Sequence, residues 1–256
     1  MGDINVLIPK EDKEIKTQVL TYWTKRADSF AETRLEEFHS AQAVYWRQEI
    51  EECLPIREGL KVLDVGCGSG FFEAILSGKG MEIMGIDLTP EMVEEGNRFL
   101  TENGIKPSLV VMDAENLTFS DDSFDAVISR NLTWTLPNPV KAYEEWFRVL
   151  KKGGVLLNFD AEYAKNFHAL DQTQNLAHSE LDHGLIEECH KIYHELQISR
   201  SDRPAWDREV LLQTGFSEVE IDTSLSDRIY RERNQFYVPD RMFRICARKN
   251  PFVFHK

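Results

Sequence analysis

The feature that most constrains the fold of this chain is a set of three glycines at alternate positions directly after a short apolar stretch. The stretch is 61–65, and the glycines are Gly66, Gly68 and Gly70. The stretch has the composition of a buried strand, and a helical pattern starts at Phe71. Glycine allows a ligand to approach the backbone closely, and the helix that follows points free N–H groups at that ligand. The sequence therefore predicts a ligand-binding turn between a strand and a helix.

The same alternation of strand and helix patterns continues along the chain. We expect further strands at 82–86, 108–112, 124–129 and 155–159, with helices between them, one of which covers 138–150. Such alternation predicts a parallel sheet covered by helices on both faces. Two more strand-like runs, 217–222 and 242–247, predict an antiparallel pair near the end of the chain. The predicted fold class is therefore α/β.

Helical segments flank this core on both sides. Amphipathic patterns predict helices at 11–30 and 35–53, and the strand signal disappears from 161 to about 213. We interpret residues 1–256 as a single domain. Its expected parts are a helical N-terminal cover (1–58), a ligand-binding core (59–160), a helical insertion (161–213) and C-terminal strands (214–256).

Charge, hydropathy and cysteine usage narrow the classes of function. The chain has 44 acidic and 30 basic residues and a net charge of −14, which disfavours sequence-independent binding to the phosphates of nucleic acids. It lacks an apolar run of the roughly 20 residues that span a bilayer, and its first residues lack the pattern of a signal peptide. Its four cysteines lie far apart, with no C-x-x-C pair, so we expect neither a disulfide framework nor a metal site. These features together predict a soluble, cytoplasmic protein.

Acidic residues at the ends of the predicted strands indicate the kind of ligand. A dinucleotide fingerprint would place a glycine where Phe71 stands, and Asp64 beside the turn would repel a pyrophosphate but attract an ammonium group. Asp87 lies 21 residues beyond Gly66, which is the spacing typical of an acid that accepts ribose hydroxyls. Residues 113–115 follow the third strand, where they can meet the edge of an adenine ring. The pattern predicts a ligand that is adenosine-like and partly cationic.

Taken together, these residues resemble the class I S-adenosylmethionine-dependent methyltransferases. The resemblance rests on Asp64-x-Gly66-x-Gly68-x-Gly70, Asp87, Asp113-Ala114, Phe124–Ser129 and Lys151–Gly154, and it is close over residues 60–160. It implies a Rossmann-like sheet of seven mostly parallel strands with an antiparallel last strand. It also implies methyl transfer from S-adenosylmethionine to an acceptor, with release of S-adenosylhomocysteine.

The resemblance also implies a role for individual residues in binding the cofactor. The methionine moiety would lie against Asp64, Gly66, Cys67, Gly68 and Gly70, the ribose against Asp87, the adenine ring against Leu88 and Met92, and the adenine edge against Asp113, Ala114 and Glu115. Tyr22 and Arg26 lie on a segment similar to helices that cover the cofactor in small-molecule members, although its aromatic stripe is equally consistent with a plain core helix. Arg130 and Asn131 would make polar contacts near the methionine end.

Candidate acceptor residues follow the fourth and fifth strands. Trp134 is a candidate wall of the acceptor pocket, with simple packing under the next helix as the alternative. Arg203 and Trp206 could face the acceptor, or could form a capped helix start with the indole in the core. Asp160 and His168 are candidate general bases, needed only if the acceptor atom must lose a proton; the alternatives are a turn carboxylate and a solvated histidine.

Several functional interpretations remain open at this point. The acidic chain and its helical covers favour a small-molecule acceptor. Residues 228–249 carry seven basic and two acidic residues, so an RNA or protein methyltransferase is an alternative, as is a non-catalytic module that senses the cofactor. His190 and His194 are four residues apart on a predicted helix, but the scattered spacing of the histidines favours solvated side chains over metal ligands.

Overall fold

The computed structural model describes residues 10–166, 174–179 and 181–250. Within these residues, seven strands form one sheet in the order β3-β2-β1-β4-β5-β7-β6. The strands are β1 (Lys61–Val65), β2 (Glu82–Asp87), β3 (Leu109–Val111), β4 (Phe124–Arg130), β5 (Leu150–Asp160), β6 (Phe216–Asp222) and β7 (Phe243–Lys249). The first five are parallel, whereas β7 lies between β5 and β6 and is antiparallel to both. The predicted seven-stranded sheet with a reversed last strand is confirmed.

The largest difference from the expected strands is at β5. The strand begins at Leu150 rather than Val155, so Lys151–Gly154, which separated the expected helix at 138–150 from the expected strand at 155–159, lies within the strand. The pairing with β4 shifts register between Phe124 and Ala126, and Gly153 has a φ of 79°. A glycine in this conformation absorbs the irregularity, so the strand continues through the bulge.

Helices cover both faces of the sheet and its carboxyl edge. They are α1 (Lys10–Phe38), α2 (Ala41–Cys53), α3 (Phe71–Leu76), α4 (Pro90–Glu102), α5 (Pro139–Val149), α6 (Tyr163–Asn166), α7 (His183–His194), α8 (Ala205–Thr214) and α9 (Leu225–Ile229). Trp46, Phe72 and Phe159 are fully or almost fully buried on one face of the sheet, and Tyr143 and Trp146 are fully buried on the other. Within the described ranges, every helix is too short or too polar to cross a lipid bilayer.

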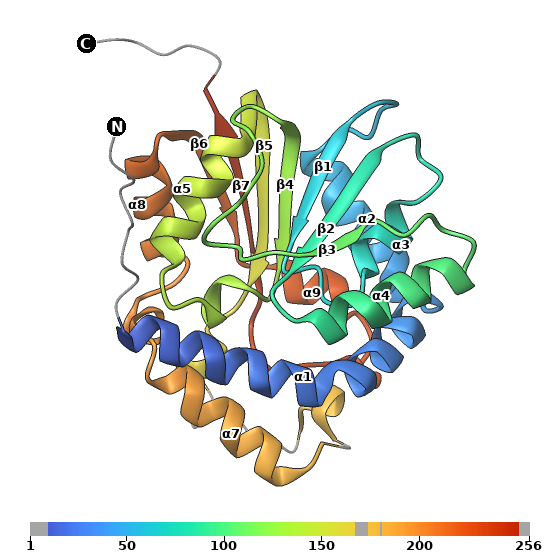
Figure 1. Cartoon of the computed structure of the whole chain (residues 1–256), viewed down its shortest axis with the longest axis vertical. Helices are drawn as coiled ribbons and strands as arrows, with labels where there is room; N and C mark the ends of the chain where they lie inside the picture. The colour runs from blue at the N-terminus through green and yellow to red at the C-terminus, as the bar shows by residue number, and fades with distance from the viewer. Residues whose placement is uncertain (1–9, 167–173, 180, 251–256) are drawn as a thin grey trace.

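The first helix is longer than the sequence pattern predicted. It runs without a break from Lys10 to Phe38, where two separate helices at 11–30 and 35–53 were expected. Residues 30–35 contain neither glycine nor proline, so nothing local ends the helix there. The break comes at Ser40, whose side chain accepts a hydrogen bond from the Gln42 N–H and caps α2. The long α1 crosses the carboxyl edge of the sheet, next to α4 and α7 (Figure 1).

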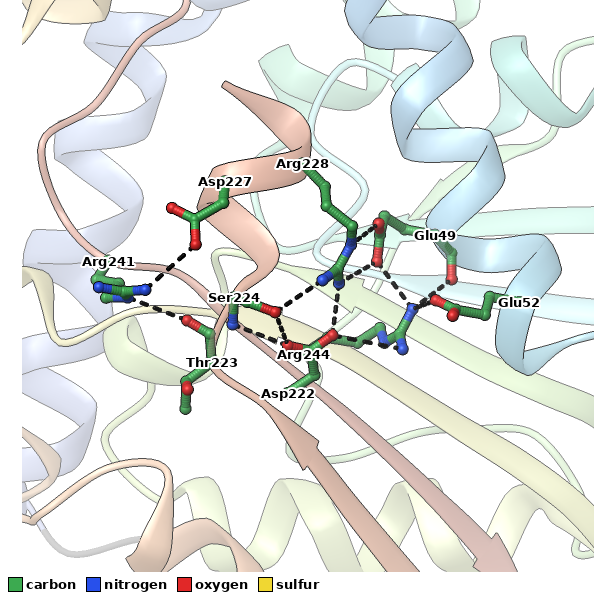
Figure 2. Close-up of polar contacts among 9 residues, drawn as sticks. All are labelled: Glu49, Glu52, Asp222, Thr223, Ser224, Asp227, Arg228, Arg241 and Arg244. Atoms are coloured by element: carbon green, nitrogen blue, oxygen red, sulfur yellow. Dashed lines mark hydrogen bonds and ion pairs between the residues drawn. The ribbon is translucent and has the colours of Figure 1, made fainter. Parts of the chain in front are cut away.

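The basic side chains of residues 228–249 are engaged in contacts within the fold. Glu49 of α2 pairs with Arg228 of α9 and with Arg244 of β7, and Asp222 at the end of β6 pairs with the same two arginines (Figure 2). All seven basic side chains of the segment contact an acid or an aromatic ring. Five make ion pairs, namely Arg228, Arg241, Arg244, Arg248 and Lys249, and two lie over tyrosine rings, namely Arg231 and Arg233. The segment therefore holds the fold together instead of forming a free cationic strip.

Candidate active site

A cavity of about 250 Å³ lies at the carboxyl ends of β1, β2 and β4, beneath α1 and α7. Of the fifteen residues expected to bind the cofactor, thirteen line it: Tyr22, Arg26, Asp64, Gly66, Cys67, Gly68, Asp87, Leu88, Met92, Asp113, Ala114, Arg130 and Asn131. Gly70 and Glu115 are the two that do not. The structure therefore brings together residues that span more than 100 positions of the sequence, and it adds a roof from α1 and α7.

The turn after β1 is held in place by β2. The N–H groups of Gly66 and Cys67 donate to the Ile86 carbonyl, at 2.8 and 3.0 Å. The Gly68 N–H donates to Asp87 Oδ2 at 3.0 Å, and the Thr89 N–H donates to Oδ1 of the same carboxylate at 2.9 Å. A carboxylate has about four acceptor positions, so Asp87 can fix the turn and still accept a ligand hydroxyl. Gly70 acts at a distance from the cavity, because its φ of 81° ends the turn and starts α3.

Gly68 allows α1 to lie close to the turn after β1. Its φ is 53°, and a Cβ there would lie 2.9 Å from the Phe30 ring of α1. A side chain at this position would push α1 away from the turn. The glycine thus permits both the backbone conformation and the close approach of the roof.

Two buried carboxylates lie behind the turn. Asp64 is 2% exposed, and Glu73 on α3 is fully buried. Burial raises the pKa of Glu73 to about 8, and burial followed by the charge of Glu73 raises the pKa of Asp64 well above its usual value. The pair therefore retains a proton at neutral pH, and a cationic group that binds at Asp64 would favour its release. The sequence analysis missed Glu73, although a lone acid in the apolar run Phe71–Leu76 was a visible signal.

The segment 113–115 after β3 is joined to α1 by a lysine. Lys16 Nζ lies 2.6 Å from Asp113 Oδ2 and 2.6 Å from Glu115 Oε2. Glu115 is 2% exposed and also accepts the Asn138 N–H at 2.8 Å, so it supports the cavity wall from behind. Lys16 was missed as a site residue, although it is a single cation between the apolar positions Ile15 and Val19.

The middle of α1 provides an unusual buried cation. Arg26 is 6% exposed and lines the cavity, and its Nε and Nη1 atoms have no hydrogen-bond partner in the described part of the chain. Burial lowers the pKa of its guanidinium. An unpaired buried guanidinium needs an anionic ligand group, and a carboxylate is the match that guanidinium geometry favours. Tyr22, one turn earlier, is 4% exposed and packs against α7.

Arg130 and Asn131, which follow β4, have distinct environments. Arg130 donates two hydrogen bonds to Glu37, at 2.9 and 3.1 Å, and its guanidinium lies 4.0 Å from the centre of the Trp46 ring. Asn131 has a φ of 57° and accepts a 2.9 Å hydrogen bond from the Tyr163 hydroxyl. The Arg130 charge is thus largely neutralised, and Asn131 is held in a turn conformation that presents it to the cavity.

Trp134 forms part of the aromatic wall of the cavity. Its ring centre lies 4.3 Å from that of Tyr193 on α7 and 5.0 Å from that of Tyr163 on α6. Its indole N–H donates to the Asn131 carbonyl at 2.9 Å. Trp134 thus lines the cavity, and its contact with an acceptor stays a prediction.

Other predicted catalytic and acceptor residues lie away from the cavity. Asp160 is fully buried and pairs with Arg203 Nη1 at 3.0 Å, and Arg203 also pairs with Asp207, four residues further on, at 2.9 Å. Trp206 packs in the core between α5, α7 and their neighbours. The reason is electrostatic, because a buried arginine needs nearby carboxylates, and the Arg203–Asp207 spacing was the signal for this. His168 lies outside the described residues.

The histidines of the insertion do not form a metal centre in the part of the chain that the structure describes. The rings of His190 and His194 stack with their centres 5.4 Å apart. No group of three or more His, Cys, Asp or Glu side chains among the described residues has an arrangement that could hold a metal ion.

Comparisons with known proteins identify the core of the chain. Residues 63–158 match the family model described as "Methyltransferase domain". Over 103 residues the chain is 39% identical to the sterol 24-C-methyltransferase of Aspergillus fumigatus, covering 39% of this chain and 27% of that protein. Over 115 residues it is 36% identical to the demethylmenaquinone methyltransferase of Staphylococcus aureus, covering 44% and 47%. The matches thus span less than half the length of these relatives.

Solved structures with the same fold cover much more of the chain. A SAM-dependent methyltransferase from Thermotoga maritima has a TM-score of 0.61 at 18% identity, covering 90% of this chain and 99% of that one. Phosphoethanolamine N-methyltransferase 2 of Haemonchus contortus, in complex with S-adenosyl-L-methionine, has a TM-score of 0.57 at 19% identity, covering 80% and 53%. Residues 63–158 therefore match a methyltransferase domain, and the described chain has the same fold as these solved S-adenosylmethionine-dependent methyltransferases.

Proposed function

We propose that this protein transfers a methyl group from S-adenosylmethionine to a small-molecule acceptor and releases S-adenosylhomocysteine. The observation that carries the proposal is that the cofactor-type residues Asp64 and Asp87 line the same roofed cavity as the aromatic wall around Trp134. A donor and a small acceptor can therefore meet under α1 and α7, away from bulk water. In our proposal the described parts of residues 1–58 and 161–213 cover this cavity, and residues 59–160 form its cofactor-binding core.

The donor set fits the chemistry of S-adenosylmethionine. The carboxylate of Asp64 suits the ammonium group of the methionine moiety, and the unpaired guanidinium of Arg26 suits its carboxylate. Asp87 is placed for the ribose hydroxyls, and Asp113 for the adenine edge. Leu88 and Met92 offer apolar surface for the adenine ring. Each half of the cofactor thus has a partner of matching charge or polarity.

When bound, the cofactor supplies a methyl group on a sulfonium, which needs no further activation by the protein. The chain's own residues contribute alignment of the two reactants and exclusion of water, which can be worth several kcal/mol of activation free energy. Asp160 is not part of this proposal as a base, because its carboxylate is buried against Arg203 and outside the cavity.

The small size of the acceptor is supported by two features. The first is the roof over the cavity. The second is that the basic residues of 228–249 are occupied within the fold, which leaves little cationic surface for RNA. The sterol and menaquinone named for the curated relatives point in the same direction.

The proposal is tested by labelled-methyl transfer to a fractionated small-molecule extract, with cofactor binding measured by calorimetry on the same protein. We expect micromolar binding of S-adenosylmethionine and transfer of label to a small molecule, and we expect both to be lost in Asp64→Asn. Tight binding without transfer to any fraction would instead support a cofactor-sensing module. Transfer to bulk tRNA that disappears in a double variant of Arg231 and Arg233 would support the RNA methyltransferase.

A further inference from the structure

The cavity contains a buried carboxylate that the cofactor does not need. Asp240, in the connection between α9 and β7, is 4% exposed and lines the cavity. Its Oδ1 atom has no hydrogen-bond partner, and its carboxylate makes no ion pair, among the described residues. A carboxylate in this state is costly, since burial without a partner forfeits its hydration. Burial raises the pKa of Asp240 to about 6, so the group is mostly ionised at neutral pH.

Aromatic side chains share the cavity with this carboxylate. Tyr163, Tyr230 and Phe236 line the same cavity. Burial is the main cause that raises the pKa values of Tyr163 and Tyr230, and the charge of Asp240 adds to it. Aromatic faces attract cations, and the attraction is strongest where water is excluded. Asp240 and these rings therefore favour the same kind of ligand group.

The neighbouring arginines do not satisfy Asp240. Arg34 and Arg130 both pair with Glu37, and Arg130 lies over the rings of Trp46 and Phe71. Neither guanidinium makes an ion pair with Asp240 in the described structure. The Asp240 carboxylate thus has no ion-pair partner among the described residues, and the one positive charge that Glu37 leaves uncompensated stays on the Arg34–Arg130 pair.

The part of the cavity lined by Asp240, Tyr163, Tyr230 and Phe236 is here called the Asp240 chamber. Its Tyr163 hydroxyl donates a 2.9 Å hydrogen bond to Asn131, which also lines the cavity and is expected near the methionine end of the cofactor. A ligand in the Asp240 chamber would therefore lie toward the methyl donor.

We propose that Asp240, with Tyr163, Tyr230 and Phe236, is the recognition site for a positively charged amine on the acceptor. A protonated amine supplies both the charge and the hydrogen-bond donor that the carboxylate lacks, whereas an alcohol supplies only the donor. Recognition of the charge is independent of which acceptor atom takes the methyl group. The inference rests on the proposed function, since the chamber matters as an acceptor site only if methyl transfer takes place.

The test compares two probes of equal shape on protein saturated with S-adenosylhomocysteine. Calorimetry with 2-phenylethylamine, which is charged at pH 7, and with the neutral 2-phenylethanol should show at least tenfold tighter binding of the amine. Asp240→Asn should remove this preference while changing the affinity for S-adenosylmethionine less than twofold. Glu232→Gln is the matched control, because it removes a carboxylate from the same connection at an exposed position outside the cavity, and it should keep the preference.

Thermal unfolding separates recognition from a structural role. Asp240→Asn replaces an unpaired buried charge with a neutral amide, so its Tm should equal or exceed that of the parent protein. Equal binding of the two probes, an unchanged preference in Asp240→Asn, or a lowered Tm together with weaker cofactor binding would each overturn the inference. Failure of the parent protein to bind S-adenosylmethionine would count against the proposed function instead. In the extract assay, the labelled acceptor should be retained on a cation exchanger at pH 7. Labelling confined to the unretained fraction would overturn the recognition of an amine by Asp240 but not the proposed methyl transfer.

Discussion

Asp87 combines two tasks in one side chain. Its two oxygens accept the N–H groups of Gly68 and Thr89, so it fixes the turn after β1 and the start of α4 at the same time. The remaining acceptor positions are those expected to meet the ribose. We therefore expect the conformation of the turn and the affinity for the cofactor to be coupled through one carboxylate.

Replacement of Asp87 by asparagine tests this coupling. Asp87→Asn keeps one acceptor oxygen but turns an amide NH₂ toward a backbone N–H. We expect the affinity for S-adenosylmethionine to fall by about tenfold or more, which corresponds to about 1.4 kcal/mol, and Tm to fall as well. Calorimetry gives the affinity, and Glu94→Gln on the exposed face of α4 serves as the control. An unchanged affinity would show that the expected ribose contact is wrong.

The Glu73 and Asp64 pair predicts a pH dependence of stability. The folded-state pKa of Glu73, about 8, lies above its ordinary value of 4.5, so the folded protein holds a proton that the unfolded chain releases. Stability from this group is fully present below about pH 4.5 and is lost as the pH rises through about 8. Glu73→Gln cannot titrate, so we expect a shallower fall in the urea midpoint between pH 5 and pH 8. If the parent and the variant show the same slope, the pair does not hold the extra proton.

At the scale of single elements, the short turn Thr133–Thr135 depends on a buried polar network. Asp160 accepts hydrogen bonds from the Thr133 hydroxyl and the Trp134 N–H, and Arg203 ties Asp160 to Asp207 on α8. The network fixes the position of Trp134 and connects β5, α8 and this turn. Asp160 and Arg203 thus shape the cavity from outside it.

Removal of the Arg203 charge should destabilise this network strongly. Arg203→Met leaves two fully buried carboxylates without a cation, and breaking such a pair typically costs about 3–5 kcal/mol. Arg203→Lys keeps the charge but loses the branched guanidinium that contacts both Asp160 and Asp207. We therefore expect an intermediate loss of unfolding free energy. Urea unfolding followed by circular dichroism measures both. A loss below about 1 kcal/mol in Arg203→Met would mean that the carboxylates find other partners.

The strands next to the glycine turn were predicted more accurately than the end of α1 and the start of β5. The alternating apolar runs around the glycine turn placed β1, β2 and β4 within one residue, because local composition and spacing determine these elements. The continuity of α1 was missed although residues 30–35 contain neither glycine nor proline, and the early start of β5 was missed because it depends on the pairing of Leu150 with Phe124 on β4.

It could likewise be predicted that the residues expected to bind the cofactor share one cavity, because they follow strand ends in sequence order. The surroundings of the candidate acceptor residues could not be predicted. Asp160 and Arg203 satisfy each other across 43 positions of the sequence, and Asp240 becomes unusual only when its burial and the absence of a partner among the described residues are known.

At the scale of the whole molecule, the roof connects segments that are far apart in sequence. Trp23 of α1 donates to the Tyr193 hydroxyl of α7 at 2.9 Å, and Lys16 joins α1 to the segment after β3. A ligand beneath the roof contacts both helices and the sheet edge. Binding of a ligand in the cavity should therefore slow amide exchange in both helices.

Hydrogen exchange with and without S-adenosylmethionine tests this expectation. At a hundredfold excess over its dissociation constant, the cofactor should stabilise the protein by about 2.7 kcal/mol, or about 5–10 °C in Tm. Amide exchange should slow in α1 and α7 more than in α9, which the cavity residues do not include. Protection confined to the turns after β1 and β2 would show that the roof does not respond to the cofactor.

The unbroken course of α1 has a consequence for how this chain can vary. Lys16, Tyr22, Arg26, Phe30 and Arg34 all reach the cavity from one side of the helix, and Arg34 lies 18 residues after Lys16, which is five turns at about 3.6 residues each. One inserted or deleted residue between them would rotate one end by about 100° relative to the other. Either Lys16 would leave Asp113 and Glu115, or Glu37 would leave Arg130 at the end of β4. Surface loops tolerate changes in length, but in this helix the number of residues is itself part of the binding site.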